Sequence, residues 1–133
     1  HWCNRACFAA AIPYIAMSHQ PPIARVGPLY DPGLTGCSAC PAAAWRHDSP
    51  LFDAVIENPR GRPSPAPTLG PPCLTTAGLV ATEILHFLTG VAPPSTLGVA
   101  YLLDLRSTSF TTSEVVPEPG CPVCSPLLAE AGG

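Results

Sequence analysis

The chain is 133 residues long and carries a net charge of −3 at neutral pH, with six basic residues, all arginine, against nine acidic ones. Charged residues make up only 11% of it, less than half the share of an average soluble domain, so a nucleic-acid module built on a basic patch is excluded. With 47% apolar residues and seven cysteines, the chain is also unlike a disordered acidic segment and can bury a core.

Length and composition favour one soluble, cytoplasmic domain over residues 1–133. Proline (19) and glycine (11) are abundant, so much of the backbone is expected in loops and turns. Every apolar run is interrupted before the 18 or so residues that a membrane span requires. The only methionine is Met17, so we expect the chain to be part of a longer protein. Its richness in Ala, Pro, Gly and Arg suggests a bacterial source.

The N-terminal third is predicted to pass from a helix into two extended segments. Residues 2–10 are rich in Ala and Cys without a helix breaker, and Pro13 follows, which predicts the end of a helix. The apolar residues 12–17 predict a buried strand, and residues 23–26 predict a second extended segment. A loop rich in glycine and proline then leads to Cys37.

A helix followed by a proline-rich connector is predicted in the middle of the chain. Ser49 is a suitable N-cap and Pro50 suits the first helical position, so residues 49–57 are interpreted as a helix. Residues 58–72 contain six prolines and no helical or strand period, which predicts a stiff crossover connector with polyproline character. Connectors of this length inside a domain are usually functional or disordered.

The clearest helix is predicted over residues 73–89, where apolar side chains recur at helical spacing and Gly90 provides a stop. Glu83 and His86 fall on its polar side. The face expected to pack on the core consists of Ala77, Val80, Ala81, Ile84, Leu85 and Leu88.

Two strands and a tail are predicted after this helix. Residues 99–105 are mostly apolar, and residues 110–116 alternate weakly in polarity, so they are interpreted as partner strands joined by a turn. Residues 125–133 end in two glycines and are expected to form a frayed tail.

Four of the seven cysteines form two pairs with a Cys-x-x-Cys spacing: Cys37 with Cys40, and Cys121 with Cys124. At this spacing a tight turn can direct both thiolates at one metal ion, so two such pairs supply the four ligands of a structural zinc site. The 80 residues between the pairs are far more than a zinc finger contains. The metal would therefore join segments distant in sequence.

Two other uses of these cysteines remain open. A thioredoxin-type dithiol would place a pair at the start of a helix after a strand, whereas glycine and proline precede both pairs. A disulfide framework is disfavoured because the number of cysteines is odd and a chain this apolar does not need cross-links. Cys3, Cys7 and Cys73 are interpreted as small buried hydrophobic residues, and Cys73 alternatively as a nucleophile.

The order of these features resembles the C-terminal half of the ThiF/MoeB/HesA family, the adenylyltransferases related to ubiquitin-activating enzymes. Asn4 and Cys7, with the strand that begins around Pro13, resemble the family's asparagine-bearing helix and the strand after it. Residues 81–90 resemble its long helix, and the two cysteine pairs occupy its zinc positions. Residues 27–37 look most like the ThiF-like proteins of bacterial clusters that mature ribosomally made peptides with thiazole, oxazole or related modifications.

This resemblance implies an α/β fold: the C-terminal portion of a Rossmann-like, ubiquitin-activating-type fold with a four-cysteine zinc site and without the nucleotide-binding half. In a full-length parent it also implies ATP and Mg²⁺. No Gly-x-Gly-x-x-Gly motif and no lysine occur here, so this chain alone is not expected to bind ATP. No catalytic or cofactor-binding residue is assigned, and whether the parent is an enzyme stays open. The metal ligands implied are Cys37, Cys40, Cys121 and Cys124.

Two functions are compatible with the resemblance, besides that of a small zinc-stabilised structural protein. The chain is either the zinc-binding part of an adenylyltransferase that activates the carboxylate of a peptide or sulfur carrier, or a non-catalytic module that presents a precursor (leader) peptide to a partner enzyme. In the second case the peptide could add to an exposed sheet edge. The expected partners are a precursor peptide or a ubiquitin-like carrier protein, with no nucleic acid and no membrane. A homodimer is implied as well.

Overall fold

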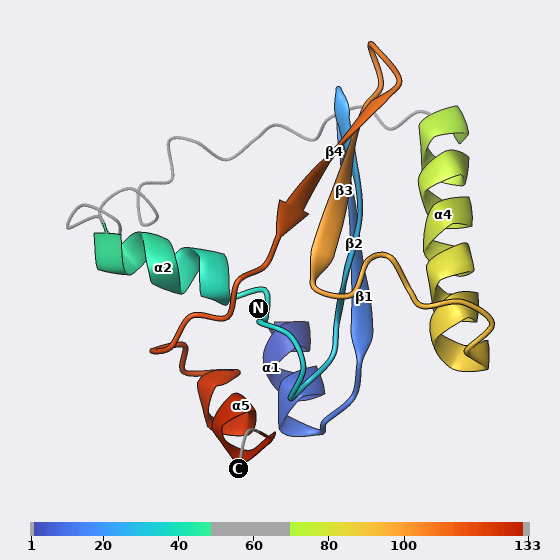
Figure 1. The fold of residues 1–133 in the computed structure, drawn as a ribbon. Helices are drawn as coiled ribbons and strands as arrows, with labels where there is room; N and C mark the ends of the chain where they lie inside the picture. Colours follow the sequence, from blue (N-terminus) through green and yellow to red (C-terminus); the bar gives the residue numbers. More distant parts are fainter. Residues whose placement is uncertain (1, 49–69, 132–133) are drawn as a thin grey trace.

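A four-stranded antiparallel sheet organises the computed structural model, which describes residues 2–48 and 70–131 (Figure 1). The strands lie in the order β1 (Tyr14–Gln20), β2 (Ile23–Tyr30), β3 (Val99–Asp104) and β4 (Ser109–Glu114). The helices are α1 (Trp2–Ala9), α2 (Cys40–Asp48), α4 (Gly70–Thr89) and α5 (Ser125–Ala131). This arrangement confirms the predicted α/β class.

Short connections set the register of the sheet. β1 and β2 form a hairpin in which Tyr14 lies opposite Tyr30, with an irregularity in β1 between Ile15 and Met17. β2 then pairs with β3, so that Val26 lies opposite Tyr101, and β3 pairs with β4 across a tight turn. Segments on either side of the 49–69 region therefore meet in the middle of one sheet.

Gly27 allows the centre of β2 to approach the segment that precedes β3. Its φ of +79° lies in the left-handed region, which favours glycine. A Cβ atom built there would lie 2.8 Å from the carbonyl oxygen of Val99 and 2.9 Å from the Cβ of Thr96. Because neither contact can be tolerated, this position requires glycine.

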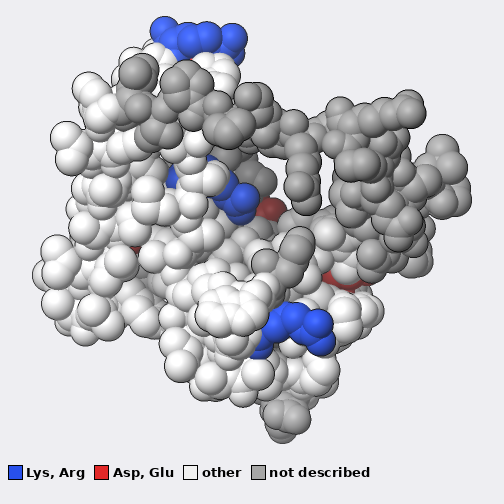
Figure 2. Space-filling model, turned by 180° about the vertical axis from the view of Figure 1, so that it is seen from behind, with Lys and Arg blue, Asp and Glu red and all other residues white. Residues whose placement is uncertain are grey.

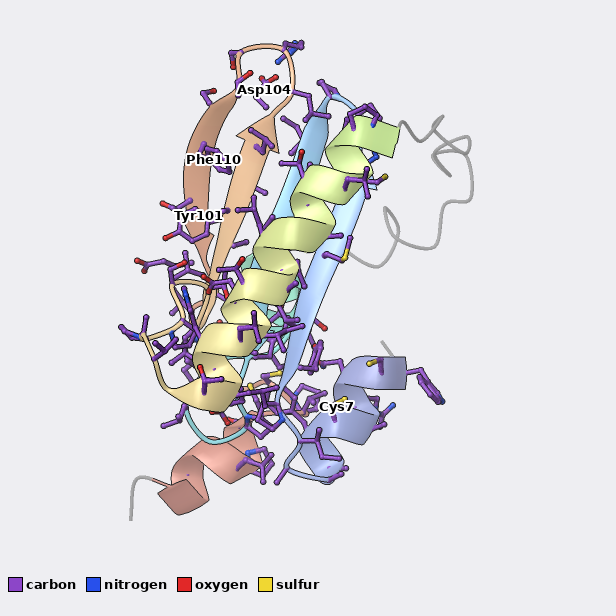
Figure 3. All side chains as sticks on the ribbon, turned by 90° about the vertical axis from the view of Figure 1, so that its right-hand side faces the viewer. Cys7, Tyr101, Asp104 and Phe110 are labelled. Atoms are coloured by element: carbon purple, nitrogen blue, oxygen red, sulfur yellow. The ribbon has the colours of Figure 1, made fainter. Side chains whose placement is uncertain are left out.

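Helix α4 packs against β1 and β2 along one face of the sheet (Figures 1 and 3). Its buried residues are Thr76, Val80 and Glu83. The predicted apolar face was wrong in this respect: of its six members only Val80 is buried, and Leu85 and Leu88 are 58% and 73% exposed. Glu83, predicted on the polar side, faces the protein interior because the loop after α4 provides its hydrogen-bond partners.

A second layer of contacts lies at the end of the sheet where α1 and α5 are found (Figure 1). One continuous cluster of buried side chains gathers here: Phe8, Tyr30, Cys37, Cys40, Val115, Cys121 and Cys124. The ring of Tyr14 packs on that of Tyr30, with 4.9 Å between the ring centroids. The cysteine pairs are thus part of the hydrophobic core.

Several element bounds differ from the sequence prediction. The helix ending before Pro13 is present as α1, whereas β2 extends to Tyr30 and includes residues predicted as loop. Helix α2 was not predicted, and the helix predicted at 49–57 lies outside the described residues, as does all of the predicted connector except residues 70–72. Those three residues begin α4, because proline suits a first helical turn. Residues 125–131 form α5 instead of a frayed tail.

Charge is sparse on the surface of the described part. Figure 2 shows blue arginine side chains at separate places on one face, without a continuous basic patch. Among the described residues, no helix is both long and apolar enough to cross a membrane.

Candidate metal centre

Four buried thiols converge within the core cluster. Their sulfur atoms all lie within 4.8 Å of one another, and Cys37, Cys40, Cys121 and Cys124 are each 0% exposed. The Sγ–Sγ distances are 3.6 Å for Cys37–Cys121, 3.2 Å for Cys40–Cys124 and 3.9 Å for Cys37–Cys40. Zinc with four tetrahedral bonds of about 2.3 Å needs sulfurs about 3.8 Å apart. The cluster therefore fits such an ion.

The first cysteine pair is shaped by the loop after β2. The amides of Leu34 and Thr35 both donate to the carbonyl of Asp31 at 3.0 Å, which closes a turn. A second turn follows, in which the Cys40 amide donates to the Cys37 carbonyl at 3.0 Å. Helix α2 begins at Cys40. Both thiols are thereby presented from a turn that leads into a helix.

Backbone amides point at the sulfurs of this first pair. The Cys37 amide donates to the Cys40 Sγ at 3.2 Å, and the Ala39 amide donates to the Cys37 Sγ at 3.3 Å. Such donors stabilise a thiolate more than a thiol. The turn therefore prepares both sulfurs for a cation.

The second pair lies in a similar turn at the start of α5. The Cys121 amide donates to the Glu118 carbonyl at 2.9 Å, and the Ser125 amide donates to the Cys121 carbonyl at 3.2 Å. The two turns approach closely: a Cβ atom built on Gly36 would lie 3.1 Å from the backbone of Pro117. Glycine thus lets the two cysteine-bearing segments meet.

The electrostatics of the cluster favour a bound cation. Burial raises the pKa of the Cys37 thiol, against hydrogen bonds from Asn4 and Ala39, and burial strongly raises the pKa of Cys124. Burial also acts on Cys121, but the amides of Cys124 and Val123 outweigh it and lower its pKa. Four buried thiolates cannot coexist without compensating charge, which a divalent ion supplies.

Asn4 connects helix α1 to this centre, and sequence reasoning did not assign it a role. The side chain is 3% exposed, and its Oδ1 accepts hydrogen bonds from the Tyr14 hydroxyl at 2.7 Å and the Ser38 amide at 3.2 Å. Burial raises the pKa of Tyr14 to about 12, so its hydroxyl remains a donor. Asn4 therefore fixes the turn between Cys37 and Cys40 from outside the ligand set.

The other three cysteines are not fully buried, contrary to the prediction. Cys3 is exposed and Cys7 half-buried on α1, with their sulfurs 3.8 Å apart. Cys73 is half-buried near the start of α4, and its Sγ lies 3.8 Å from Nδ1 of His19 on β1. Figure 3 labels Cys7 on its helix. None of them lies in the cluster of four.

The arrangement has the chemistry of a structural metal site. Four sulfur ligands would complete a tetrahedron and leave no open position for a substrate. All seven cysteines are free thiols. Helix α2 begins at Cys40, so the first pair does stand at the start of a helix, and its position in the fold does not by itself exclude a redox dithiol. The convergence of all four sulfurs distinguishes the centre from a pair acting alone.

Comparisons with known proteins identify similar folds. A model of the ThiF family matches residues 1–123. E. coli MccB, solved with AMPCPP and MccA, is 29% identical with a TM-score of 0.72, over 92% of this chain and 35% of that chain. The microcin C7 biosynthetic enzyme MccB, in complex with N-formylated MccA, is 28% identical with a TM-score of 0.71, over 92% and 36%.

A further likeness concerns the fold alone. The heterocyclase TruD is 24% identical with a TM-score of 0.70, over 92% of this chain and 20% of that chain. The chain spans about a third of the length of the MccB structures that it matches. A search of curated proteins found no match.

Proposed function

Because the chain belongs to the ThiF family, we propose that it is the zinc-binding C-terminal part of a ThiF-like adenylyltransferase in a bacterial biosynthetic cluster. The parent would activate the C-terminal carboxylate of a peptide or of a sulfur-carrier protein. The observation that carries this proposal is the family match over residues 1–123, combined with four buried thiols at the spacing and distances of a zinc tetrahedron. The similar MccB structures contain AMPCPP and the peptide MccA.

In this reaction a carboxylate oxygen attacks the α-phosphorus of ATP, an acyl-adenylate forms, and pyrophosphate leaves. Basic groups, a phosphate-binding loop and a magnesium ligand must stabilise the charge that develops. This chain has no lysine and no Gly-x-Gly-x-x-Gly motif, so we assign it none of those steps. We propose that its contribution is a rigid sheet and a surface for the partner.

Zinc is the proposed metal because four thiolates in a tetrahedral array suit it. When bound, zinc would compensate the charge of Cys37, Cys40, Cys121 and Cys124. These ligands would then hold the loop after β2 against the segment after β4. Such a clip stabilises the fold and takes no part in the adenylation chemistry.

The second candidate is a non-catalytic module that holds a precursor peptide for a partner enzyme. It is favoured by one observation: within the described residues, β4 ends the sheet and all six of its residues are exposed. For either function we propose a cytoplasmic location and a homodimeric parent.

Two measurements test the proposal. Metal analysis of the purified chain is expected to give about one zinc per chain, as a site with four cysteine ligands predicts; clearly less would contradict the metal assignment. The proposed full-length parent is expected to catalyse exchange of pyrophosphate into ATP only when its peptide or carrier is present. Peptide binding without any exchange would favour the non-catalytic module.

A further inference from the structure

The outer edge of β4 has the properties of a docking site for an extended chain. β4 is the last strand in the order β1-β2-β3-β4, and no strand within residues 2–48 and 70–131 pairs with its far side. Natural edge strands are usually protected by lysine, proline or a bulge. β4 reads Ser-Phe-Thr-Thr-Ser-Glu and has none of these; its one charged residue, Glu114, stands at its end, while Phe and Thr favour strand pairing.

The hydrogen-bond alternation shows which backbone groups this edge offers. The Val115 amide donates to the Gly98 carbonyl at 2.8 Å, and in an antiparallel ladder such bonded pairs alternate with unbonded ones. The bond from the Leu105 amide to the Pro22 carbonyl, on the other side of β3, fits the same alternation. The residues whose N–H and C=O groups point away from β3 are therefore Phe110, Thr112 and Glu114.

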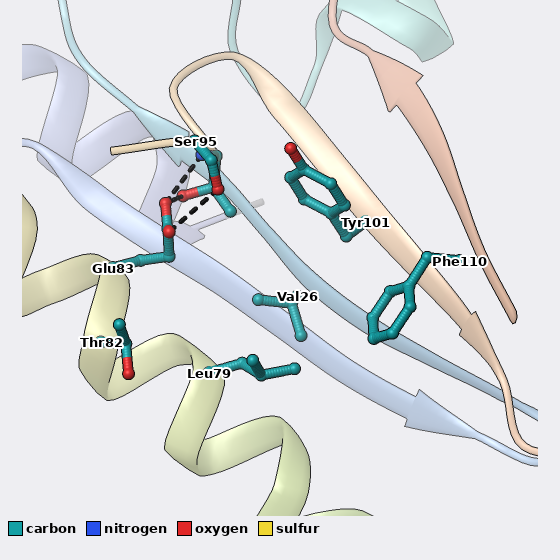
Figure 4. A pocket seen from close by; sticks show the side chains of 8 residues that line it. Val26, Leu79, Thr82, Glu83, Ser95, Tyr101 and Phe110 are labelled. Atoms are coloured by element: carbon teal, nitrogen blue, oxygen red, sulfur yellow. Dashed lines mark hydrogen bonds between the residues drawn. The ribbon is translucent and has the colours of Figure 1, made fainter. Parts of the chain in front are cut away.

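The side chains of these three residues lie on the sheet face that carries α4. Thr112 is opposite Tyr101, and Tyr101 and Phe110 line a cavity of about 430 Å³ together with Leu79 of α4 (Figure 4). Phe110 is 51% exposed and lies at the β4 side of this cavity. A strand added to β4 would place one side chain directly beside the Phe110 ring.

The edge also carries one charged side chain that has no partner of opposite charge among the described residues. Glu114 lies four residues from Phe110 on the same strand face, and it is exposed. Among the described residues, no basic side chain lies within salt-bridge distance of it. A basic residue on an added strand would meet its carboxylate.

We propose that an extended peptide adds to β4 as a fifth strand, with an apolar residue beside Phe110 and a basic residue beside Glu114. Because alternate residues share a face, the peptide carries these two side chains four positions apart. This inference rests on the proposed function, because it takes the peptide to be a segment of the precursor or carrier on which the parent acts. The backbone of β4 would then bind any extended peptide through hydrogen bonds, and the side chains of Phe110 and Glu114 would select its sequence.

A second copy of this chain fits the edge less well. If β4 pairs with itself about a two-fold axis so that all three outward residues are used, Thr112 lies opposite Thr112 and Glu114 lies opposite Phe110. A carboxylate then faces an aromatic ring and finds no cation. The chain has no lysine and only six arginines, so a peptide of different composition is the better complement.

The test uses the full 133-residue chain and a fluorescein-labelled peptide of nine residues. The peptide alternates Thr and Val, with arginine at its third and leucine at its seventh position, because a strand that adds antiparallel to β4 meets Glu114 before Phe110. Binding is followed by fluorescence anisotropy, against a peptide in which these two residues are exchanged for Asp and Ser. We expect the Leu/Arg peptide to bind about tenfold more tightly or better.

Thr112→Pro is the decisive variant. Proline removes an amide that points away from β3, so the β3–β4 ladder is kept, while strand addition is blocked. The matched control Thr112→Val keeps the amide. We expect Thr112→Pro to weaken binding about tenfold and Thr112→Val to change it less than about twofold. Equal binding by Thr112→Pro and the unchanged chain would overturn the proposal.

A charge reversal keeps the test decisive if the proline variant does not fold. Glu114→Lys is expected to prefer a peptide with glutamate in place of arginine, and an unchanged preference would overturn the inference. Sedimentation of the chain without peptide reports the alternative occupant: a dimer that Thr112→Pro dissociates would assign the edge to a second copy instead.

The proposed function is read out separately by zinc content and by pyrophosphate exchange in the proposed full-length parent. If both are intact while the peptide preference is absent, the docking inference alone fails. If the peptide preference is present while exchange and zinc are absent, the proposed function fails and the docking surface stands.

Discussion

Replacing Glu83 by alanine is expected to destabilise the chain by about 3 kcal/mol, although the residue lies far from the thiol cluster in sequence. The carboxylate is 8% exposed. It accepts hydrogen bonds from the Thr96 amide at 2.8 Å, the Thr96 hydroxyl at 2.7 Å and the Ser95 hydroxyl at 2.9 Å. These bonds fasten the end of α4 to the segment that leads into β3.

The magnitude follows from what the substitution leaves behind. Thr96 is 1% exposed, so its amide would lose its partner without access to water, which costs about 2 kcal/mol. Its buried hydroxyl adds about 1 kcal/mol, whereas Ser95 is exposed and can bond to water. Thermal unfolding should show a decrease in Tm of roughly 10 °C. The control Glu83→Gln keeps an acceptor oxygen and should lose about 1 kcal/mol.

The same carboxylate predicts a pH dependence. Burial disfavours its charge, but the hydrogen bonds from Thr96 and Ser95 and the nearby His86 outweigh burial and lower its pKa below the ordinary 4.5. Because the pKa of Glu83 is lower in the folded than in the unfolded chain, its carboxylate stabilises the fold fully at a pH above the unfolded-state pKa. This stabilisation is lost as the pH falls through the folded-state pKa. The stability difference between the unchanged chain and Glu83→Gln should therefore shrink below about pH 4.5. A difference independent of pH, or a Glu83→Ala variant as stable as the unchanged chain, would refute the reasoning.

Three further predictions concern the metal centre and the helix α4. Cys124→Ser should bind less than one zinc per chain because a ligand is lost. Its Tm should be similar to that of the unchanged chain from which a chelator has removed the zinc. Full zinc content with an unchanged Tm would contradict this prediction. Asn4→Ala should lose zinc to a competing chromogenic chelator about tenfold faster than Asn4→Asp, which keeps an acceptor for Tyr14 and Ser38; equal release rates would show that Asn4 has no such role. Val80→Ala should cost about 2 kcal/mol in urea unfolding, whereas Leu85→Ala on the exposed side should change stability by less than about 0.5 kcal/mol; the opposite order would show that Leu85, and not Val80, packs on the core.

The convergence of the four thiols could be anticipated because its signal is local. A spacing of two residues between cysteines demands a tight turn, whatever the rest of the chain does, and two such turns in one apolar chain predict four converging thiols. The contacts that hold the turns could not be anticipated in the same way. Asn4 and Ser38 are 34 positions apart, and only the packing of α1 beside the first cysteine pair brings them together.

Local signals also explain the errors in the helices. Pro41 stands next to Cys40 inside α2, and the glycine- and proline-rich approach suggested a loop, although proline in a first helical turn removes no needed donor. The sequence predicts a frayed tail over residues 125–133 because this segment ends in two glycines. The neighbouring cysteine turn and the contacts of Leu127 with the core cluster hold residues 125–131 as a helix.

The shift of the buried face of α4 away from the predicted one has a physical cause that the helix sequence does not contain. Ranking faces by apolar content assumes that a buried polar group is unpaired and therefore costly. On α4 that assumption fails twice: the Thr76 hydroxyl donates to the Pro72 carbonyl at 2.8 Å within the helix, and Glu83 is satisfied by Thr96, thirteen residues later. Once both polar groups are paired, their burial costs little, and the buried face is decided by shape and by the partners that β1, β2 and the following loop provide. A helix pattern therefore predicts that α4 exists and where it ends, whereas its orientation depends on residues that lie on other elements.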